Sequence, residues 1–560
     1  MARLIECVPN FSEGRDMAVI KLITDAIETV DGVKLLDVDP GAATHRTVVT
    51  FAGEPEAVIE AAVRAGQKAR ETIDMTKHSG EHPRFGAMDV CPLVPIAGVT
   101  MDETAEYART LARRLGEEVG VPIFCYENAA TSDERRNLAV VRAGEYEALP
   151  DRLKDPRWKP DFGPAEFVPS YGATAVSARD FLVAYNVNLN TTSTRRANAI
   201  AFDVREKGRI KREGDPLTGE IVKDADGKTV WTPGSLKCVK GIGWFIEEYG
   251  VAQISMNLTN IAVTPVHVAF DECVKKATER GIRVTGSEIV GLIPLEAMLD
   301  AGRYFLRKQK RSTGVSDAEL IKIAVKSMGM DDLGPFVAEE KIIEYVLAKD
   351  APKGLVDRTL KEFVEETQSE SPAPGGGSVA AALGALGAAL GTMVANLSSH
   401  KRGWDARWAE FSEWAEKGKA CQDELVHLVD EDTNAFNAIM DAFRLPQGSD
   451  EEKRAREQAI QAATLHAIEV PFRVMEVSLA SMEIAKGMAE VGMESSVSDA
   501  GVGALCARSA VMGAYLNVKI NVSDLADKAA AEDFVTRGAK LVESAQALES
   551  EVLGLVEDRL

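Results

Sequence analysis

The sequence predicts a multidomain protein, in which two α/β subdomains of related β-α-β-β-α topology are followed by an all-α helical bundle. Its 560 residues exceed what a single hydrophobic core usually fills. Strand-like and helix-like segments alternate in the first part of the chain, whereas long Ala-, Glu-, Leu- and Lys-rich runs dominate the last part. The expected domains are an N-terminal subdomain at 1–180, a second subdomain at 181–335, a linker at 336–354 and the helical domain at 355–560.

The elements of the first subdomain follow from its apolar spacing. Short runs of β-branched residues indicate strands, and apolar residues recurring every three to four positions indicate helices. Pro55 opens a helix, because the first turn does not need the N–H that proline lacks. In chain order we expect a strand at 4–8, a helix at 16–30, strands at 33–38 and 46–51 separated by a Pro-Gly turn, and the helix from Pro55.

A similar order returns in the second subdomain. Its first strand alternates apolar residues with Asn186 and Asn188, which is typical of a half-buried strand. The polar, turn-rich stretch 207–233 reads as a long surface hairpin or loop. The expected elements are strands at 181–189, 236–245 and 251–258, with helices at 195–205 and from Pro265.

Beyond the linker the patterns are helical, and 516–522 is the one stretch that also reads as a strand. Residues 379–398 carry no charge and are long enough to span a membrane. Their composition is mostly Ala and Gly, however, and the glycines at 384, 387 and 391 have helical spacing. Small residues at this spacing let helices approach closely, so we expect a buried helix of a bundle and no membrane contact.

Composition excludes several classes of function. A net charge of −22 argues against broad binding of nucleic acid or of anionic membranes. The seven cysteines are odd in number and scattered, and no CxxC occurs, so neither a disulfide framework nor a zinc ribbon is expected. The N-terminus carries Glu6 and lacks a long apolar core, unlike a signal peptide. These features favour a reducing, cytoplasmic location.

The segment KHSGEHPRFGAMDVCPLVPI, at 77–96, holds two of the seven histidines. His82 lies in a glycine-bounded loop that runs into an apolar, strand-like run. An imidazole held in such a loop is suited to general acid/base catalysis. The spacing of His78 and His82 is equally compatible with half of a metal site or with two surface residues.

Further polar clusters end the predicted strands of the first subdomain. Asn10 opens the first cluster, and Asp39 and Arg46 bracket the second. A third, at 161–173, offers glycines for close backbone approach and aromatic rings for a flat ligand, although an ordinary loop would have the same composition. Its aromatic residues are Phe162, Phe167 and Tyr171.

Two signals stand out in the helical part. Ser378 can cap the uncharged helix, and the glycines before it leave backbone amides open to an anion. These glycines are Gly375, Gly376 and Gly377. The second signal is an acid run that contains Asp432, with Phe436 on the same helix face. Taken alone, the glycine-rich stretch is typical of a flexible connection, and the acid run is typical of a solvent-exposed helix face.

Motifs throughout the first 330 residues resemble the glutamate formimidoyltransferase family. They are CVPNFSEGR (7–15), LLDVDPG (35–41), GEHPRFGAMDVCPLVPI (80–96), RAGEYEALP (142–150), PDFGP (160–164) and VPSYGATA (168–175). The resemblance implies two α/β subdomains with folate and substrate bound between them, and transfer of a formimino group from N-formimidoyl-L-glutamate to N5 of tetrahydrofolate. It makes His82 the general acid/base, with supporting roles for Asn10, Asp39 and Arg46 at lower weight. It places folate on Gly163, Pro164, Ala165, Glu166, Phe167, Val168, Pro169, Ser170, Tyr171 and Gly172.

The helical part resembles formiminotetrahydrofolate cyclodeaminases. The matching motifs are SPAPGGGSVAAALGALGAALGTMVANL (371–397), LVDEDTNAFNAIMDAFRLP (428–446) and GAYLNVKIN (513–521). This resemblance implies closure of the formimino group onto N10 with loss of ammonia, with Asp432 as proton donor. It also implies tetrahydrofolate as co-substrate, with a polyglutamate tail, no metal, and a homo-oligomer. A methenyltetrahydrofolate cyclohydrolase-like or inactive helical domain is the alternative, and a non-catalytic folate-binding scaffold is the rival from another class.

Overall fold

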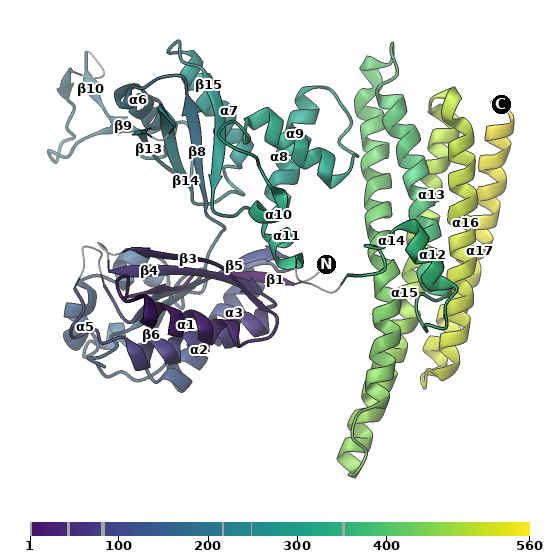
Figure 1. Cartoon of the computed structure of the whole chain (residues 1–560), viewed down its shortest axis with the longest axis horizontal. Coiled ribbons are helices and arrows are strands. Elements are labelled where there is room, and N and C mark those ends of the chain that lie inside the picture. The colour runs from purple at the N-terminus through teal and green to yellow at the C-terminus, as the bar shows by residue number, and fades with distance from the viewer. Residues whose placement is uncertain (1–2, 42–44, 80–83, 215–217, 248, 350–352) are drawn as a thin grey trace. The chain divides into compact units, whose positions relative to one another are not determined.

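The computed structural model describes residues 3–41, 45–79, 84–214, 218–247, 249–349 and 353–560. The chain forms two compact units (Figure 1). One combines Met1–Met298 with Val325–Asp350 and contains the sheets. The other combines Leu299–Ala324 with Ala351–Leu560 and is helical. The coarse prediction of an α/β part followed by a mostly helical part is confirmed.

The first sheet has a mixed order. Antiparallel pairing places β1 between β4 and β5, with β3 outside β4, and β7 and β6 extend the sheet in parallel beyond β5. The elements are β1 (Leu4–Cys7), β2 (Asn10–Phe11), α1 (Met17–Glu28), β3 (Val33–Gly41), β4 (Arg46–Gly53), α2 (Pro55–Thr72), β5 (Met88–Ala97), α3 (Met101–Arg114), β6 (Ile123–Glu127), α4 (Leu138–Val141), α5 (Glu145–Arg152) and β7 (Thr174–Ala178). Helix α2 begins at Pro55 as expected and buries its apolar stripe against the sheet.

The second sheet is wholly antiparallel. Strand β8 lies between β14 and β15, and β13 lies outside β14. The elements are β8 (Val183–Leu189), α6 (Thr194–Val204), β13 (Val239–Ile246), β14 (Val251–Leu258), α7 (Val266–Thr278) and β15 (Val284–Val290). Between α6 and β13, two small ribbons are formed by β9 (Arg209–Ile210), β10 (Arg212–Glu213), β11 (Glu220–Ile221) and β12 (Trp231–Thr232).

The region after the second sheet is helical. It contains α8 (Leu295–Lys308), α9 (Asp317–Met328), α10 (Ala338–Lys341) and α11 (Ile343–Ala348). Residues 299–324 pack with the helical unit. In the expected linker, Ile342 and Ile343 are fully buried, and Ile342 forms a parallel bridge with Ile293. Because these two isoleucines are buried, they hold the segment against the rest of the unit. The polar residues on either side of them made the segment resemble a linker in the sequence.

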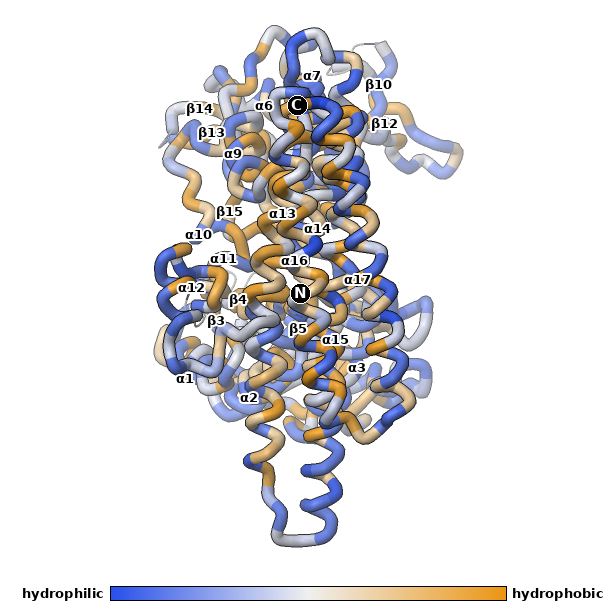
Figure 2. Tube along the Cα trace, turned by 90° about the vertical axis from the view of Figure 1, so that its right-hand side faces the viewer, coloured by the Kyte–Doolittle hydropathy of each residue, from blue (hydrophilic) through white to orange (hydrophobic). Residues whose placement is uncertain are grey.

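The helical bundle consists of α12 (Leu360–Thr367), α13 (Gly376–Ser399), α14 (Trp408–Phe443), α15 (Asp450–Val491), α16 (Val497–Asn521) and α17 (Lys528–Glu557). Its cluster of buried residues draws on α13 to α17, and Figure 2 shows apolar residues recurring along α13 and α16. Residues 516–521 are helical, so the strand alternative for 516–522 is wrong. Of their apolar residues Val518 is buried in the bundle, whereas Leu516 and Ile520 are exposed at the end of α16.

Helix α13 is long and apolar enough to cross a membrane, yet most of its residues are buried inside the bundle. Its glycines face other helices closely. A Cβ on Gly387 would lie 2.7 Å from the carbonyl oxygen of Gly503 in α16, and one on Gly384 would lie 2.5 Å from Ser478 Oγ in α15. The expected close approach is therefore satisfied within the chain itself.

Candidate functional site

His82, with Gly80, Glu81 and Pro83, lies outside the described residues. Of the described residues, Ser79 and Arg84 are its nearest neighbours along the chain. Arg84 is fixed by an ion pair with Glu147, at 2.6 Å, and its guanidinium lies 4.7 Å from the ring centre of Tyr146. The strand segment that follows His82 therefore starts from an anchored position.

The predicted folate segment packs directly against that strand segment. Ala87 N–H donates to the carbonyl of Tyr171, at 2.7 Å, and Ala173 N–H donates to the carbonyl of Phe85, at 3.1 Å. Gly86 forms a bridge with Gly172, and a Cβ on Gly86 would overlap the Ala173 carbonyl. Glycine is thus required at position 86, and the structure brings the end of the predicted folate segment, Tyr171 and Gly172, next to residues 85–87.

The aromatic residues of this segment differ in how far their rings are exposed. Tyr171 is 0% exposed, and its hydroxyl lies 2.9 Å from Thr174 Oγ1, so its ring offers no face to a ligand. Phe167 is half-buried, and its ring centre lies 5.4 Å from that of Tyr146. The Tyr146 hydroxyl donates to the carbonyl of Pro169, at 2.5 Å, which fixes the segment on α5.

A buried charge cluster lies beneath the same strand. Asp89, 2% exposed on β5, forms an ion pair with Arg142 at 2.9 Å. Burial raises the pKa of Asp89, and the positive charges of Arg142 and Arg46 oppose that shift. Arg46 also donates to Asn10 Oδ1. The structure therefore joins two predicted residues, Asn10 and Arg46, to Asp89 and Arg142, which the sequence reasoning missed.

Asp39 does not belong to this cluster. It is exposed on β3, where it pairs in register with Val48 of β4. Because Val48 also pairs with Asn10 of β2, Asp39 lies on the same face of the sheet as Asn10, but on the outer strand.

A second polar array combines Glu13, His45 and His78. The Nε2 atom of His45 lies 3.1 Å from Glu13 Oε1, and its Nδ1 lies 2.9 Å from the Ser79 carbonyl oxygen. The partners of both ring nitrogens are oxygen acceptors. The His45 ring stacks on His78, with centres 4.4 Å apart.

The two neighbours of His45 have shifted pKa values. Burial would raise the pKa of Glu13, but the backbone N–H groups of Asp16 and Arg15, together with His45, lower it below its usual value. Burial lowers the pKa of His78, and His45 adds to this effect. His78 is therefore a buried imidazole with a lowered pKa, and its Nε2 donates to the His45 carbonyl at 2.8 Å.

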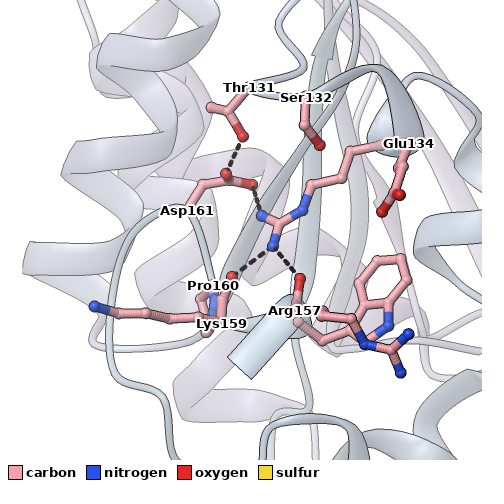
Figure 3. Close-up of a pocket in the computed structure, with 9 residues that line it drawn as sticks. Thr131, Ser132, Glu134, Arg157, Lys159, Pro160 and Asp161 are labelled. Atoms are coloured by element: carbon pink, nitrogen blue, oxygen red, sulfur yellow. Dashed lines mark hydrogen bonds and ion pairs between the residues drawn. The ribbon is translucent and has the colours of Figure 1, made fainter. Parts of the chain in front are cut away.

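A cavity of about 450 Å³ opens beside the start of the folate segment (Figure 3). Asp161 lies in its wall and forms an ion pair with Arg135 at 2.7 Å, and it accepts from the Cys125 N–H at 2.8 Å. Arg135 also donates to the carbonyls of Arg157 and Lys159, at 3.0 and 2.7 Å. These contacts make Asp161 a structural link between β6 and the loop.

The helical unit positions Asp432 at the start of α13. Its Oδ2 accepts from the backbone N–H of Ser378, at 2.8 Å, and from the Ser378 hydroxyl, at 3.0 Å. A Cβ on Gly377 would overlap the carboxylate. Burial raises the pKa of Asp432, and the two donors of Ser378 partly offset that shift. The result is a carboxyl group that holds its proton to higher pH than an exposed aspartate.

Ser378 does not cap α13 as expected. The N-cap is Gly375, and no side chain makes a capping hydrogen bond there. Ser378 is the third residue of the helix, and its N–H is satisfied by Asp432 from α14. Gly376 lies against Asn517 of α16, whose amide nitrogen would be 3.2 Å from a Cβ at position 376. The Gly-rich turn thus brings α13, α14 and α16 together around one carboxylate.

The other acids of the run have separate partners. Asp430 accepts from the Leu355 N–H, at 2.6 Å, and Glu431 pairs with His466, at 2.9 Å. Among the described residues, no group of three or more His, Cys, Asp or Glu side chains is arranged to hold a metal ion.

Comparison with known proteins shows which families each part of the chain resembles. The formiminotransferase domain, N-terminal subdomain, matches residues 4–179, the formiminotransferase domain matches 184–348, and the formiminotransferase-cyclodeaminase family matches 359–540. A Mus musculus protein named formimidoyltransferase-cyclodeaminase is 42% identical over 560 residues, covering 100% of both chains. A Streptococcus pyogenes glutamate formimidoyltransferase is 40% identical over 55% of this chain and 94% of its own. A Methylorubrum extorquens methenyltetrahydrofolate cyclohydrolase is 35% identical over 36% of this chain and 98% of its own.

Proposed function

The chain belongs to the formimidoyltransferase-cyclodeaminase family, and we propose that it carries out two consecutive reactions on tetrahydrofolate. The first transfers the formimino group of N-formimidoyl-L-glutamate to N5. The second closes that group onto N10 and releases ammonia, giving 5,10-methenyltetrahydrofolate. The observation that carries the proposal is the presence of both halves in one chain, since the likeness to the mouse enzyme covers the whole length.

In the transfer step, N5 attacks the formimino carbon and the bond from that carbon to the glutamate nitrogen breaks. N5 loses a proton and the departing nitrogen gains one. We assign both proton transfers to His82, because an imidazole changes protonation near neutral pH. The anchored Arg84 and the packing of Tyr171 and Gly172 against residues 85–87 support a folate site beside His82.

The donor substrate is a dicarboxylate, so its site needs positive charge. Arg46 and Arg142 supply it beside Asn10, and Asp89 holds them in place. A guanidinium binds a carboxylate through two parallel hydrogen bonds. Asp39, exposed on β3, has the weakest support of the predicted residues.

In the ring closure, N10 attacks the formimino carbon and the nitrogen of that group leaves as ammonia. The leaving amine must gain a proton. We assign this donation to Asp432, whose pKa burial raises. The Gly375–Ser378 turn supports that role by holding one oxygen of the carboxylate and leaving no room for a side chain beside it.

One experiment tests both assignments. The wild type, given N-formimidoylglutamate and tetrahydrofolate, should produce the methenyl-folate absorbance together with ammonia. His82→Ala should abolish transfer and leave ring closure of 5-formimidoyltetrahydrofolate intact, and Asp432→Ala should do the reverse. If both variants lose the same step, the two-site assignment fails.

The same assay separates the rival functions. The Methylorubrum relative is named as a cyclohydrolase, so the helical domain has a second candidate reaction, hydrolysis of the methenyl ring. Methenyl-folate consumed without ammonia release would favour that reaction. Folate binding without any turnover would favour a scaffold.

Further properties belong to the proposal. The matching strand orders, β3-β4-β1-β5 and β13-β14-β8-β15, support a related β-α-β-β-α topology for the two subdomains. We also propose a polyglutamylated co-substrate, no metal, a cytoplasmic location and a homo-oligomer. The exposed apolar residues of α13 support the oligomer, since its glycine face is already used within the bundle. They are Leu386, Met393 and Leu397.

A further inference from the structure

The second sheet has one polar face. On β8, the apolar residues Val183, Tyr185 and Val187 are fully buried on the face that α6 and α7 cover. Helix α6 is so close to this face that a Cβ on Gly243 would overlap its backbone. Asn186 and Asn188 alternate with the apolar residues and therefore belong to the opposite face.

Strand pairing arranges this opposite face in two rows. One row crosses the sheet through Ile242, Ser255, Asn186 and Glu288, and the other through Trp244, Gln253, Asn188 and Gly286. Polar side chains thus occupy the centre of a sheet face, where burying apolar side chains would cost less free energy. The arrangement calls for a reason beyond stability.

A directed hydrogen-bond network connects the two rows. Trp244 Nε1 donates to Gln253 Oε1, at 3.2 Å, and Gln253 Nε2 donates to Asn188 Oδ1, at 2.8 Å, and to Glu288 Oε1, at 3.1 Å. Asn186 Nδ2 also donates to Glu288 Oε1, at 2.8 Å. Gln253 and Asn188 are 0% exposed, so the network holds the carboxylate in one orientation.

The two oxygens of Glu288 therefore differ. Oε1 accepts two amide donors, which fills its two lone pairs. Within the part of the chain that the structure describes, Oε2 has no hydrogen-bond partner, and the side chain is only half-buried. Three apolar side chains are exposed on the same face: Val290 on the strand of Glu288, at 50%, and Ile242 and Trp244 on β13, at 51% and 39%. The site is an acceptor oxygen on a sheet face that also exposes apolar and aromatic side chains.

We propose that Glu288 receives the pyrimidine edge of the pterin ring of the folate co-substrate. This edge presents N3–H and the 2-amino group side by side, and both donors can converge on one carboxylate oxygen. The flat bicycle would lie against Trp244 and Ile242. The inference rests on the proposed function, since it presumes that a reduced folate is the co-substrate.

The formimino group of the donor substrate also offers paired N–H groups. That substrate carries two carboxylates, which the charge of Glu288 repels, and it lacks an aromatic body for the exposed apolar side chains. The pterin therefore fits this face better. The face also belongs to the same unit as the transfer site, and α10 and α11 join the two sheets. Lys341 Nζ donates to the Ile289 carbonyl in β15, at 3.4 Å, and Lys34 Nζ donates from β3 to the Val346 carbonyl, at 2.8 Å.

The test is the affinity of 5-formyltetrahydrofolate, a stable reduced folate, measured by calorimetry. Glu288→Gln should weaken binding roughly tenfold to hundredfold, because a charged acceptor is lost and an amide N–H faces the ligand's donors. Glu279→Gln, at the exposed end of α7, is the matched control and should bind as the wild type. Val290→Lys should also weaken binding, because its ammonium would compete for Oε2 without touching the network.

A second ligand separates recognition from structural damage. A 2-desamino analogue should bind the wild type more weakly than the parent folate, and Glu288→Gln should not discriminate between the two ligands. Unchanged folate affinity in Glu288→Gln and Val290→Lys, or a loss confined to the KM for N-formimidoylglutamate, would overturn the inference. If the wild type forms methenyl-folate and these variants bind folate normally, the proposed role of Glu288 is refuted and the proposed function stands. If the wild type shows no turnover, the proposed function is refuted instead.

Discussion

Replacing Gly377 by alanine is the sharpest test of how Asp432 is positioned. Gly377 is the second residue of α13 and is buried. An added Cβ would overlap the carboxylate of Asp432, which Ser378 holds through two hydrogen bonds. The carboxylate and its hydrogen bonds must therefore give way, because the helix backbone is fixed by its packing in the bundle.

The magnitudes decide the outcome of this substitution. Alanine improves helix propensity by about 0.5–1 kcal/mol. Overpacking costs about 1–3 kcal/mol, and loss of a hydrogen bond to a charged acceptor costs about 1.5–3 kcal/mol. We therefore expect Gly377→Ala to destabilise the helical unit by about 1.5–5.5 kcal/mol. A positioned proton donor is worth roughly 10²–10⁴-fold in rate, so ammonia release should fall by about a hundredfold or more.

The assay is ammonia release from 5-formimidoyltetrahydrofolate, followed as a function of pH. In the wild type the rate should fall as pH rises through the raised pKa of Asp432, because the carboxyl group must be protonated to donate. If the displaced carboxyl is more solvated in Gly377→Ala, the fall should move to lower pH. Gly554→Ala in α17, where a Cβ meets nothing within 4 Å, is the control. Wild-type ammonia release by Gly377→Ala would refute the positioning argument.

Two further predictions concern buried charges in the sheet unit. Burial raises the pKa of Glu6 from 4.5 to about 7, against the opposing charge of Arg179. The folded state thus holds the Glu6 proton more tightly than the unfolded state, so the free energy of unfolding falls as pH rises from 4.5 to 7. The fall amounts to up to about 3 kcal/mol. Glu6→Gln should remove it, as thermal melts recorded across this pH range would show. Arg142→Met leaves the buried Asp89 carboxylate without its ion pair, so the free energy of unfolding should fall by about 3–5 kcal/mol. Adding Asp89→Asn in a double variant should restore most of this loss. Additive losses in the double variant would contradict the pairing.

Local patterns predicted the elements well where burial and periodicity agree. The expected strand at 181–189 is β8, the expected helix from Pro55 is α2, and the expected strand at 251–258 is β14. The stretch 516–522 misled because its short apolar alternation fits a strand, whereas it forms the exposed end of α16, in which Val518 is buried and Leu516 and Ile520 are exposed. An apolar run of this length does not distinguish a strand from a helix.

The site residues that the sequence missed share one property: their partners are distant in the chain. Asp89 meets Arg142 across 53 positions, and Gln253 meets Asn188 across 65. No local spacing encodes such pairs, although one signal was present. Asn186 and Asn188 appeared at alternate positions of a predicted strand, which marks a polar sheet face before the partners are known.

The acid run at 430–432 shows why sequence alone could not select a proton donor by chemistry. Successive side chains on a helix diverge by about 100°, so three adjacent acids face three different environments. Asp430 holds the backbone at Leu355 and Glu431 faces His466, whose positive charge, when protonated, favours the carboxylate. Asp432 lies against Gly377, and burial raises its pKa. A carboxyl group of this kind is suited to protonate a leaving amine, so the tertiary contact with α13, rather than the acid run itself, supports the role proposed for Asp432.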